Sequence, residues 1–335
     1  MTASSCWTPT CAPTVCSPAS SRAACLAVST ASASLRRMVP SSWVSSRAML
    51  PIVQHLGATP PRWVRARVEF VRRMISIVAA AATVAACATA PEVGSGPGSG
   101  QRAPERLGVE VVEVLPHDPD AFTQGLEIAG DTLYESTGLV GESTLRAGPV
   151  GAEPTAVASL EEPLFGEGIT VVGDRVWQLT WRGGVAVEWD RETLTERRRA
   201  DYSGEGWGLC HQPGRERLVA SDGSPTLTFR DPDDFSRIGS VTVTDSGTEV
   251  DELNELECVG DEIYANVWHS DDILRIDPES GTVTARIDAS GLLDPAERQD
   301  ADVLNGIAAY GDSGYFLLTG KLWPKMFKVR FVPSG

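Results

Sequence analysis

The sequence predicts an all-β fold, a five-bladed β-propeller, over residues 107–335. Two observations support this prediction. From Leu107 onward, short alternating apolar runs are broken by Gly, Asp and Pro, and no long run has the period of a helix. A turn followed by a strand also recurs roughly every 40 to 50 residues, which is typical of propeller blades with about four short strands each.

The repeat unit is a short polar turn that leads into an apolar strand. It is clearest at 130–134, 173–177 and 260–264, with weaker copies at 215–218 and 312–316. Its anchor residues lie 43, 41, 46 and 52 residues apart and are Tyr134, Trp177, Leu218, Tyr264 and Phe316. Thirteen residues past the middle three anchors, an aspartate is predicted to open the next turn: Asp190, Asp231 and Asp277. Five anchors within 229 residues fit five blades and leave too little chain for seven.

The N-terminal part of the chain differs in composition from the rest. Residues 1–63 are dominated by Ser, Ala, Pro, Thr and Arg and show no sustained periodicity. We interpret them as a disordered extension or, the view we favour, as a mis-annotated stretch upstream of the true start. Residues 64–87 are predicted to be a signal peptide, because Arg72 and Arg73 precede an apolar run of 12 residues, too short for a membrane span.

Cys87 follows small residues directly and resembles a bacterial lipobox cysteine, which would carry a diacylglyceryl group. The alternative is a plain signal peptide with a coincidental cysteine. Residues 88–106 are rich in Gly, Ser and Pro and predict a flexible linker. We therefore expect an extracytoplasmic domain, lipid-anchored to the membrane or secreted.

Charge and cysteine content narrow the class further. The formal net charge is −16, although residues 1–87 contain nine Arg and one acidic residue, so the acidity lies in the folded part. Such a domain should repel phosphate backbones, and nucleic acid is not expected as a partner. We expect a monomer that touches the membrane only through a lipid on Cys87. Cys210 and Cys258 form a disulfide or remain two buried thiols; an exported domain permits either.

The repeat register places polar and aromatic residues at one end of the propeller axis. Ten or eleven residues before the anchors are Gln124, Glu167, Trp207, Asn254 and Asn305, and four or five residues after them are Gly138, Trp181, Asp222, Trp268 and Lys321. Since inner strands line the central channel, these positions should converge at one mouth.

That mouth would hold one acid, one base and aromatic walls. Glu167, enclosed by Phe165, Trp181 and Trp207, is the expected general acid/base, with a pKa raised by desolvation. Lys321, Gln124 and Asn254 would donate to a developing oxyanion. The structural alternative is that the Glu-Gly turn is only a turn and that the tryptophans pack between blades. His117 is expected to cap a turn, no histidine has zinc-ligand spacing, and the GEGWG segment (204–208) lacks the context of a phosphate loop.

The motifs also resemble a known family. They are HDPDAFTQGL (117–126), YESTG (134–138), FGEG (165–168), LTW (179–181), GWG (206–208), SDGS (221–224), LNELE (253–257), NVW (266–268), VLNGIA (303–308) and TGKLWP (319–324). In this order they resemble the plant- and bacterial-type glutamine cyclotransferases. The resemblance spans essentially all of 107–335 and none of 1–106.

The resemblance implies a five-bladed propeller that converts N-terminal glutaminyl residues of peptides or proteins to pyroglutamate (5-oxoproline) and releases ammonia. It implies that Glu167 moves the proton and that Lys321 assists catalysis. It further implies a substrate site formed by Gln124, Trp181, Trp207, Asn254, Trp268, Phe122 and Phe165. No cofactor, and no zinc or other catalytic metal, is expected; a structural calcium ion is associated with the plant-type fold, with no ligands assigned here.

Two other functions remain open from the residues alone. A calcium-dependent lactonase-like propeller hydrolase would use Glu167, Asp222, Asn254 and Asn305 as an axial ring, although Lys321 and three tryptophans suit a hard dication poorly. A surface-anchored propeller that only binds a partner would show no turnover.

Overall fold

The computed structural model describes residues 103–334, which form strands and connecting turns with three short 3-10 segments, η1 (Pro213–Arg215), η2 (Glu297–Gln299) and η3 (Gly311–Ser313). The all-β prediction is confirmed. The expected extension at 1–63, the signal segment with Cys87 and linker residues 88–102 lie outside the described residues. Strand β1 (Glu105–Pro116) includes the last two residues of the expected linker, 105 and 106. Within 103–334, no helix has the length and apolar character that a bilayer crossing requires.

Three of the sheets are four-stranded antiparallel meanders in which each strand pairs with the next along the chain. The first comprises β2 (Thr123–Ala129), β3 (Thr132–Thr137), β4 (Thr144–Pro149) and β5 (Ala156–Ser159). The second comprises β6 (Gly166–Val172), β7 (Arg175–Thr180), β8 (Val185–Asp190) and β9 (Glu196–Asp201). The third comprises β10 (Leu209–Gln212), β11 (Arg217–Ala220), β12 (Thr226–Arg230) and β13 (Arg237–Thr242).

The remaining long strands form one eight-stranded sheet in the order β16-β17-β18-β19-β1-β22-β21-β20. Their bounds are β16 (Leu253–Val259), β17 (Glu262–Val267), β18 (Asp272–Ile276), β19 (Val283–Asp288), β20 (Leu304–Ala309), β21 (Phe316–Gly320) and β22 (Lys325–Pro333). All its pairs are antiparallel except β1 with β19, which is parallel. A two-stranded hairpin, β14 (Thr244–Asp245) and β15 (Thr248–Glu249), completes the strands of 103–334.

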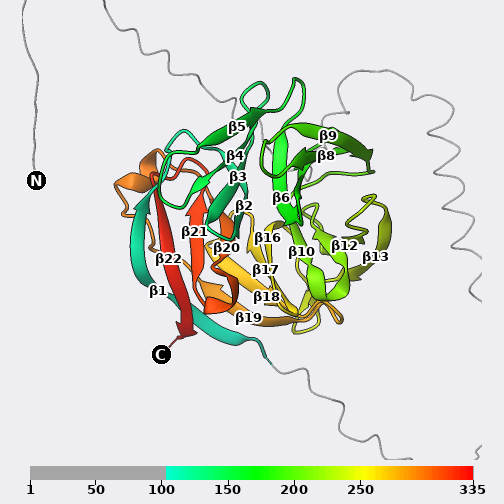
Figure 1. Ribbon diagram of the computed structural model, residues 1–335. Helices are drawn as coiled ribbons and strands as arrows, with labels where there is room; N and C mark the ends of the chain where they lie inside the picture. The colour runs from blue at the N-terminus through cyan, green and yellow to red at the C-terminus, as the bar shows by residue number, and fades with distance from the viewer. Residues whose placement is uncertain (1–102, 335) are drawn as a thin grey trace, which may run out of the picture. The chain divides into compact units, whose positions relative to one another are not determined.

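The innermost strands form a closed ring. β2 contacts β6 and β20, β10 contacts β6 and β16, and β16 contacts β20. Figure 1 shows these strands gathered at the middle of the molecule, with β5, β9, β13 and β1 farther out. The apolar core lies between neighbouring sheets: Tyr134 and Leu145 of the first sheet pack in one cluster with Val176 and Trp189 of the second. The ring therefore combines the first strand of each meander with β16 and β20, the two end strands of the eight-stranded sheet.

The repeat predicted from the sequence is found in the strands. Each anchor residue lies in the second strand of its unit: β3, β7, β11, β17 or β21. The three predicted turns are also confirmed, because the Oδ1 atoms of Asp190, Asp231 and Asp277 accept hydrogen bonds from backbone N–H groups two and three residues on. These carboxylates satisfy turn amides that have no strand partner.

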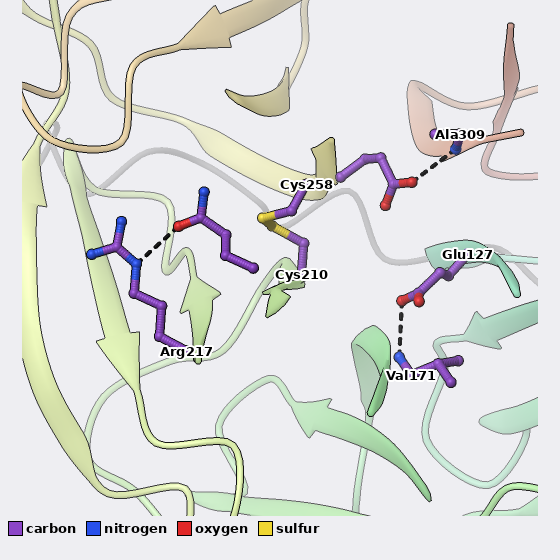
Figure 2. The surroundings of a disulfide bond; sticks show 8 residues. Glu127, Val171, Cys210, Arg217, Cys258 and Ala309 are labelled. Atoms are coloured by element: carbon purple, nitrogen blue, oxygen red, sulfur yellow. Dashed lines mark hydrogen bonds between the residues drawn. A yellow bond between two sulfur atoms is a disulfide. The ribbon is translucent and has the colours of Figure 1, made fainter. Parts of the chain in front are cut away.

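A disulfide joins two inner strands. Cys210 of β10 and Cys258 of β16 are bonded with their Cα atoms 5.4 Å apart, which settles the choice that the sequence left open. Figure 2 shows the bond lying beside carboxylates such as Glu127 of β2, whose Oε2 accepts from the Val171 amide at 2.9 Å. The bridge links the third meander to the eight-stranded sheet, and its two cysteines are 48 residues apart in the sequence.

Removing this bridge should lower stability without changing the fold. We expect the double variant Cys210→Ala, Cys258→Ala to lose about 2–4 kcal/mol of unfolding free energy, since the bond restricts the unfolded chain. Chemical denaturation of variant and wild type, both under non-reducing conditions, measures the difference. An unchanged denaturation midpoint would show that the bridge contributes nothing.

Candidate active site

The predicted site residues lie at β-bulges in the inner strands. Strand pairing shifts register at Gln124 in β2, at Glu167 in β6, at Asn254 in β16 and at Asn305 in β20. A bulge places extra residues opposite the partner strand and turns their side chains away from the regular alternation. Each of four inner strands therefore carries one polar residue at a bulge. Sequence analysis did not predict the bulges, although the glycine that follows most of these residues was a signal for them.

These glycines allow the inner strands to approach closely. A Cβ atom at Gly168 would lie 2.6 Å from the carbonyl oxygen of Trp207, and one at Gly208 would lie 2.1 Å from that of Asn254. Both contacts are with backbone, which cannot move aside cheaply. Any larger residue at Gly168 or Gly208 would therefore clash with the backbone of the neighbouring inner strand.

A hydrogen-bonded chain of three side chains crosses the mouth. The Gln124 Nε2 donates to the Glu167 Oε1 at 3.3 Å, and the Asn305 Nδ2 donates to the Gln124 Oε1 at 3.3 Å. Asn305 also donates to the Thr123 carbonyl at 3.0 Å. The amide of Gln124 is thereby oriented with its NH₂ group toward the carboxylate. The predicted convergence of Gln124, Glu167 and Asn305 is confirmed.

Glu167 and Lys321 are both buried, and each influences the other electrostatically. Their exposed fractions are 5% and 6%. Burial raises the pKa of Glu167 well above its usual value; the charge of Lys321 opposes this and that of Glu205 adds to it. Burial also lowers the pKa of Lys321, against the attraction of Glu167 and Asp302. The two shifts bring the pKa values of the carboxyl and the ammonium group closer together, which is typical of functional sites.

Aromatic rings line the site on two sides. On one side, the rings of Phe122 and Phe165 meet edge to face at 6.2 Å, and Trp181 lies 5.8 Å from Phe165. On the other side, the rings of Trp207 and Trp268 meet edge to face at 5.5 Å. The Lys321 Nζ lies 4.9 Å from the centre of the Phe122 ring, which ties the cation to the first wall.

Glu205 is a site residue that sequence analysis missed. Its Oε2 accepts from the indole Nε1 of Trp181 at 2.7 Å and from that of Trp207 at 3.1 Å, while its Oε1 pairs with Arg182 at 2.8 Å. Burial would raise its pKa, but Arg182 and the indoles outweigh this and hold the pKa of Glu205 below its usual value. One carboxylate thus fixes two of the three tryptophans. The only sequence feature that could have indicated Glu205 is its position in the GEGWG segment, two residues before Trp207.

Releasing the two indoles should weaken substrate binding more than chemistry. We expect Glu205→Ala to raise KM by roughly 10-fold with kcat little changed, since two hydrogen bonds of about 1 kcal/mol each orient the walls. Steady-state kinetics with the substrate measures KM and kcat separately. A fall confined to kcat would instead place Glu205 in the chemical step.

Other predicted residues are placed differently. Asn254 is buried on β16 and its carbonyl accepts from Ser221 at 2.6 Å. Asp222 is occupied by its own turn, because its Oδ1 accepts from the amide and hydroxyl of Ser224. The prediction that His117 caps a turn is wrong: Asp118 accepts from the Asp120 amide, and the His117 ring binds distant segments instead.

Within 103–334, no cluster of three or more His, Cys, Asp and Glu side chains is arranged to hold a metal ion. At the far end of the axis, Glu255 and Glu257 accept backbone N–H groups, from Ile307 and Ala309 respectively. The calcium ion that the resemblance associates with the fold stays a prediction without assigned ligands.

Comparisons with known proteins agree on one family. Residues 77–331 match a family model described as glutamine cyclotransferase. A curated relative, the glutaminyl-peptide cyclotransferase of Arabidopsis thaliana, is 40% identical over 229 residues, which cover 66% of this chain and 71% of the relative. The crystal structure of Myxococcus xanthus glutaminyl cyclase is 42% identical, covers 69% of this chain and 100% of its own, and superposes with a TM-score of 0.63.

Proposed function

The chain belongs to the glutamine cyclotransferase family, and on that premise we propose that it closes N-terminal glutamine to pyroglutamate at the mouth formed by Gln124, Glu167 and Lys321. The main support for placing the reaction at these residues is the buried carboxylate of Glu167, which accepts a hydrogen bond from the Gln124 amide and feels the charge of Lys321. Family membership does not favour the lactonase or the binding-only alternative.

The reaction needs only proton transfer and a bent substrate. The neutral α-amine of the substrate attacks its own side-chain amide carbon, so that a C–N bond forms within one residue. Glu167 takes a proton from the attacking nitrogen and delivers it to the amide nitrogen, whose C–N bond then breaks to release ammonia. Atoms and charges balance without water or a cofactor. Because both reacting groups belong to one molecule, holding the bent conformer supplies much of the rate.

The remaining residues have supporting roles. The carbonyl oxygen gains negative charge during attack, and the ammonium group of Lys321 and the NH₂ group of Gln124 can stabilise it. Asn254 binds the same carboxamide, while Phe122, Phe165, Trp181, Trp207 and Trp268 enclose the substrate. Apolar walls also favour the uncharged amine, which is the reactive form.

We propose that the sheets are the five blades of a propeller. Cutting the eight-stranded sheet at its single parallel pair, β1 with β19, leaves two four-stranded units, β16 to β19 and β20-β21-β22-β1. The second unit takes its outer strand from the start of the chain. With the three separate meanders this makes five units around the ring of inner strands (Figure 1). N- and C-terminal strands paired in one unit would close the ring.

We propose that the domain acts outside the cytoplasm as a monomer without a cofactor, tethered by a lipid on Cys87 or secreted. The disulfide between Cys210 and Cys258 supports an oxidising compartment. Mass spectrometry of the membrane fraction would detect a diacylglyceryl group on Cys87; an unmodified, soluble protein would support secretion instead.

Ammonia release from a short peptide that begins with Gln tests the function. The purified enzyme should release one ammonia per peptide, with the matching mass loss, and EDTA should not reduce the rate. A peptide that begins with Asn serves as the control, because its ring would be one atom smaller. Lack of release by folded enzyme would contradict the cyclotransferase assignment, and loss of activity in EDTA would contradict a metal-free site.

A further inference from the structure

His117 lies buried behind the site rather than in it. Its side chain is 3% exposed and sits in the loop between β1 and β2, five residues before Phe122. Three segments meet at its ring: strand β3 through Glu135, strand β21 through Thr319, and the turn between β21 and β22 through Trp323. The proposed mechanism gives this ring no role.

Both ring nitrogens of His117 face acceptors. Nδ1 lies 2.7 Å from the carbonyl oxygen of Trp323, and Nε2 lies 2.9 Å from Oε1 of Glu135. The Thr319 hydroxyl, 3.2 Å from Nδ1, donates to the Lys325 carbonyl at 3.0 Å and so offers the ring only a lone pair. A neutral imidazole has one donor, whereas the imidazolium has two. The geometry therefore requires a proton on each nitrogen.

Two carboxylates and one cation lie around the ring; the carboxylates favour the imidazolium, and the cation helps to keep Glu135 ionised. These groups are Glu135 on β3, Arg146 on β4 at 4.0 Å from the far oxygen of Glu135, and Asp118 in the same loop. Burial alone would lower the pKa of His117, but the hydrogen bond and charge of Glu135 outweigh it, and the pKa is raised. Thr123 also donates to Glu135 at 2.7 Å, so that carboxylate is held as an acceptor.

The contacts of His117 join the two segments that carry Phe122 and Lys321. Its backbone N–H donates to the Pro324 carbonyl at 3.0 Å, and the Leu322 N–H donates to the Ala121 carbonyl at 2.7 Å. Lys321 lies in the same turn as Trp323, and its Nζ faces the Phe122 ring. A displaced turn would move the lysine that stands beside Glu167.

We propose that His117 is a positioning residue for the cyclisation: bonded to Glu135 and to the Trp323 carbonyl, its imidazolium holds the β21–β22 turn, and with it Lys321, against the loop that carries Phe122. The inference rests on the proposed function of Lys321. Full activity then requires that the His117 ring keep both of its protons.

A pair of amide variants isolates the bond to the turn. In His117→Asn the side-chain NH₂ group replaces Nδ1 and keeps the bond to Trp323, whereas in His117→Gln it replaces Nε2 and keeps only the bond to Glu135. Both lose the charge, so both should have a lower Tm. Measured well below both Tm values, kcat/KM should fall less than about 3-fold in the Asn variant and about 10- to 100-fold in the Gln variant. A purely structural role predicts equal activities, which would overturn the proposal.

Ring-nitrogen NMR tests the protonation state independently of activity. At a pH about one unit above the ordinary histidine pKa of ~6.5, His117 should still carry two ring protons. His211 of β10 is the internal control, because burial lowers its pKa and its ring should be neutral there. A neutral His117 ring would contradict the imidazolium. If the wild-type enzyme releases no ammonia, the proposed function itself is contradicted. If the wild-type enzyme is active and both variants are equally active, only the positioning role of His117 is contradicted.

Discussion

Glu167→Gln is expected to fold normally and to lower kcat for a Gln-initiated peptide by about 10²- to 10⁴-fold, the usual contribution of a positioned acid/base. Glutamine keeps the size of the side chain and an oxygen that can accept from Gln124. It removes the group that takes the amine proton and returns it to the leaving nitrogen. Ammonia release under saturating peptide measures the loss.

The matched control is Glu127→Gln. Glu127 is a half-buried glutamate on an inner strand, but it lies at the far end of the axis, where its carboxylate accepts from the Val171 amide. An amide oxygen there can still accept that bond. We expect activity close to wild type in the control. Retention of wild-type turnover in Glu167→Gln, or equal losses in both variants, would remove Glu167 from the chemical step.

The pH dependence of kcat adds a second signature of Glu167. As a base the carboxylate must be ionised, so kcat falls as the pH falls through its pKa in the enzyme–substrate complex. Because burial raises that pKa, the acid limb should lie above the pKa of about 4.3 of an ordinary glutamate. The limb should be absent from the residual activity of Glu167→Gln.

The sequence predicts the positions on the chain better than the contacts they make. The anchors and the turn aspartates recur at regular intervals, and such a repeat can be recognised in the sequence alone. The order of the strands and the position of Gln124 and Glu167 within their strands could therefore be predicted. The bulges could not, because an extra residue in a strand is defined by the register of its partner. Asp222 has the spacing of a site residue, but its carboxylate accepts hydrogen bonds from Ser224 in its own turn, which the spacing could not reveal.

Side chains that act through a second residue were missed for a similar reason. Glu205 stands among glycines without periodic apolar neighbours, and only the folded chain brings the indoles of Trp181 and Trp207 to it. His117 reads locally as a loop residue, while its partners lie at distant positions of the chain. Local propensity cannot predict such pairings. The same holds for the disulfide, which the cysteines permit but do not require.

Lys321→Met is expected to lower kcat/KM by about 10²- to 10³-fold, the loss typical of one oxyanion donor. Methionine preserves an unbranched apolar side chain and removes the charge that faces the Phe122 ring. The same change removes the cation that opposes the raised pKa of Glu167, so the acid limb of kcat should move to still higher pH. A shift toward lower pH would contradict the pairing of these two groups.

Lys328→Met is the control for Lys321→Met, because the Lys328 Nζ also faces aromatic rings, 4.5 Å from the centre of Tyr310 and 5.1 Å from that of Tyr315, but on strand β22. Losing this half-buried cation–π contact should cost about 1 kcal/mol of stability and leave kcat/KM unchanged. If both variants lose activity equally, the effect belongs to the loss of a lysine on an aromatic ring in general. If only Lys321→Met loses it, and its acid limb moves as stated, the cation acts on both the developing oxyanion and the carboxylate that moves the proton.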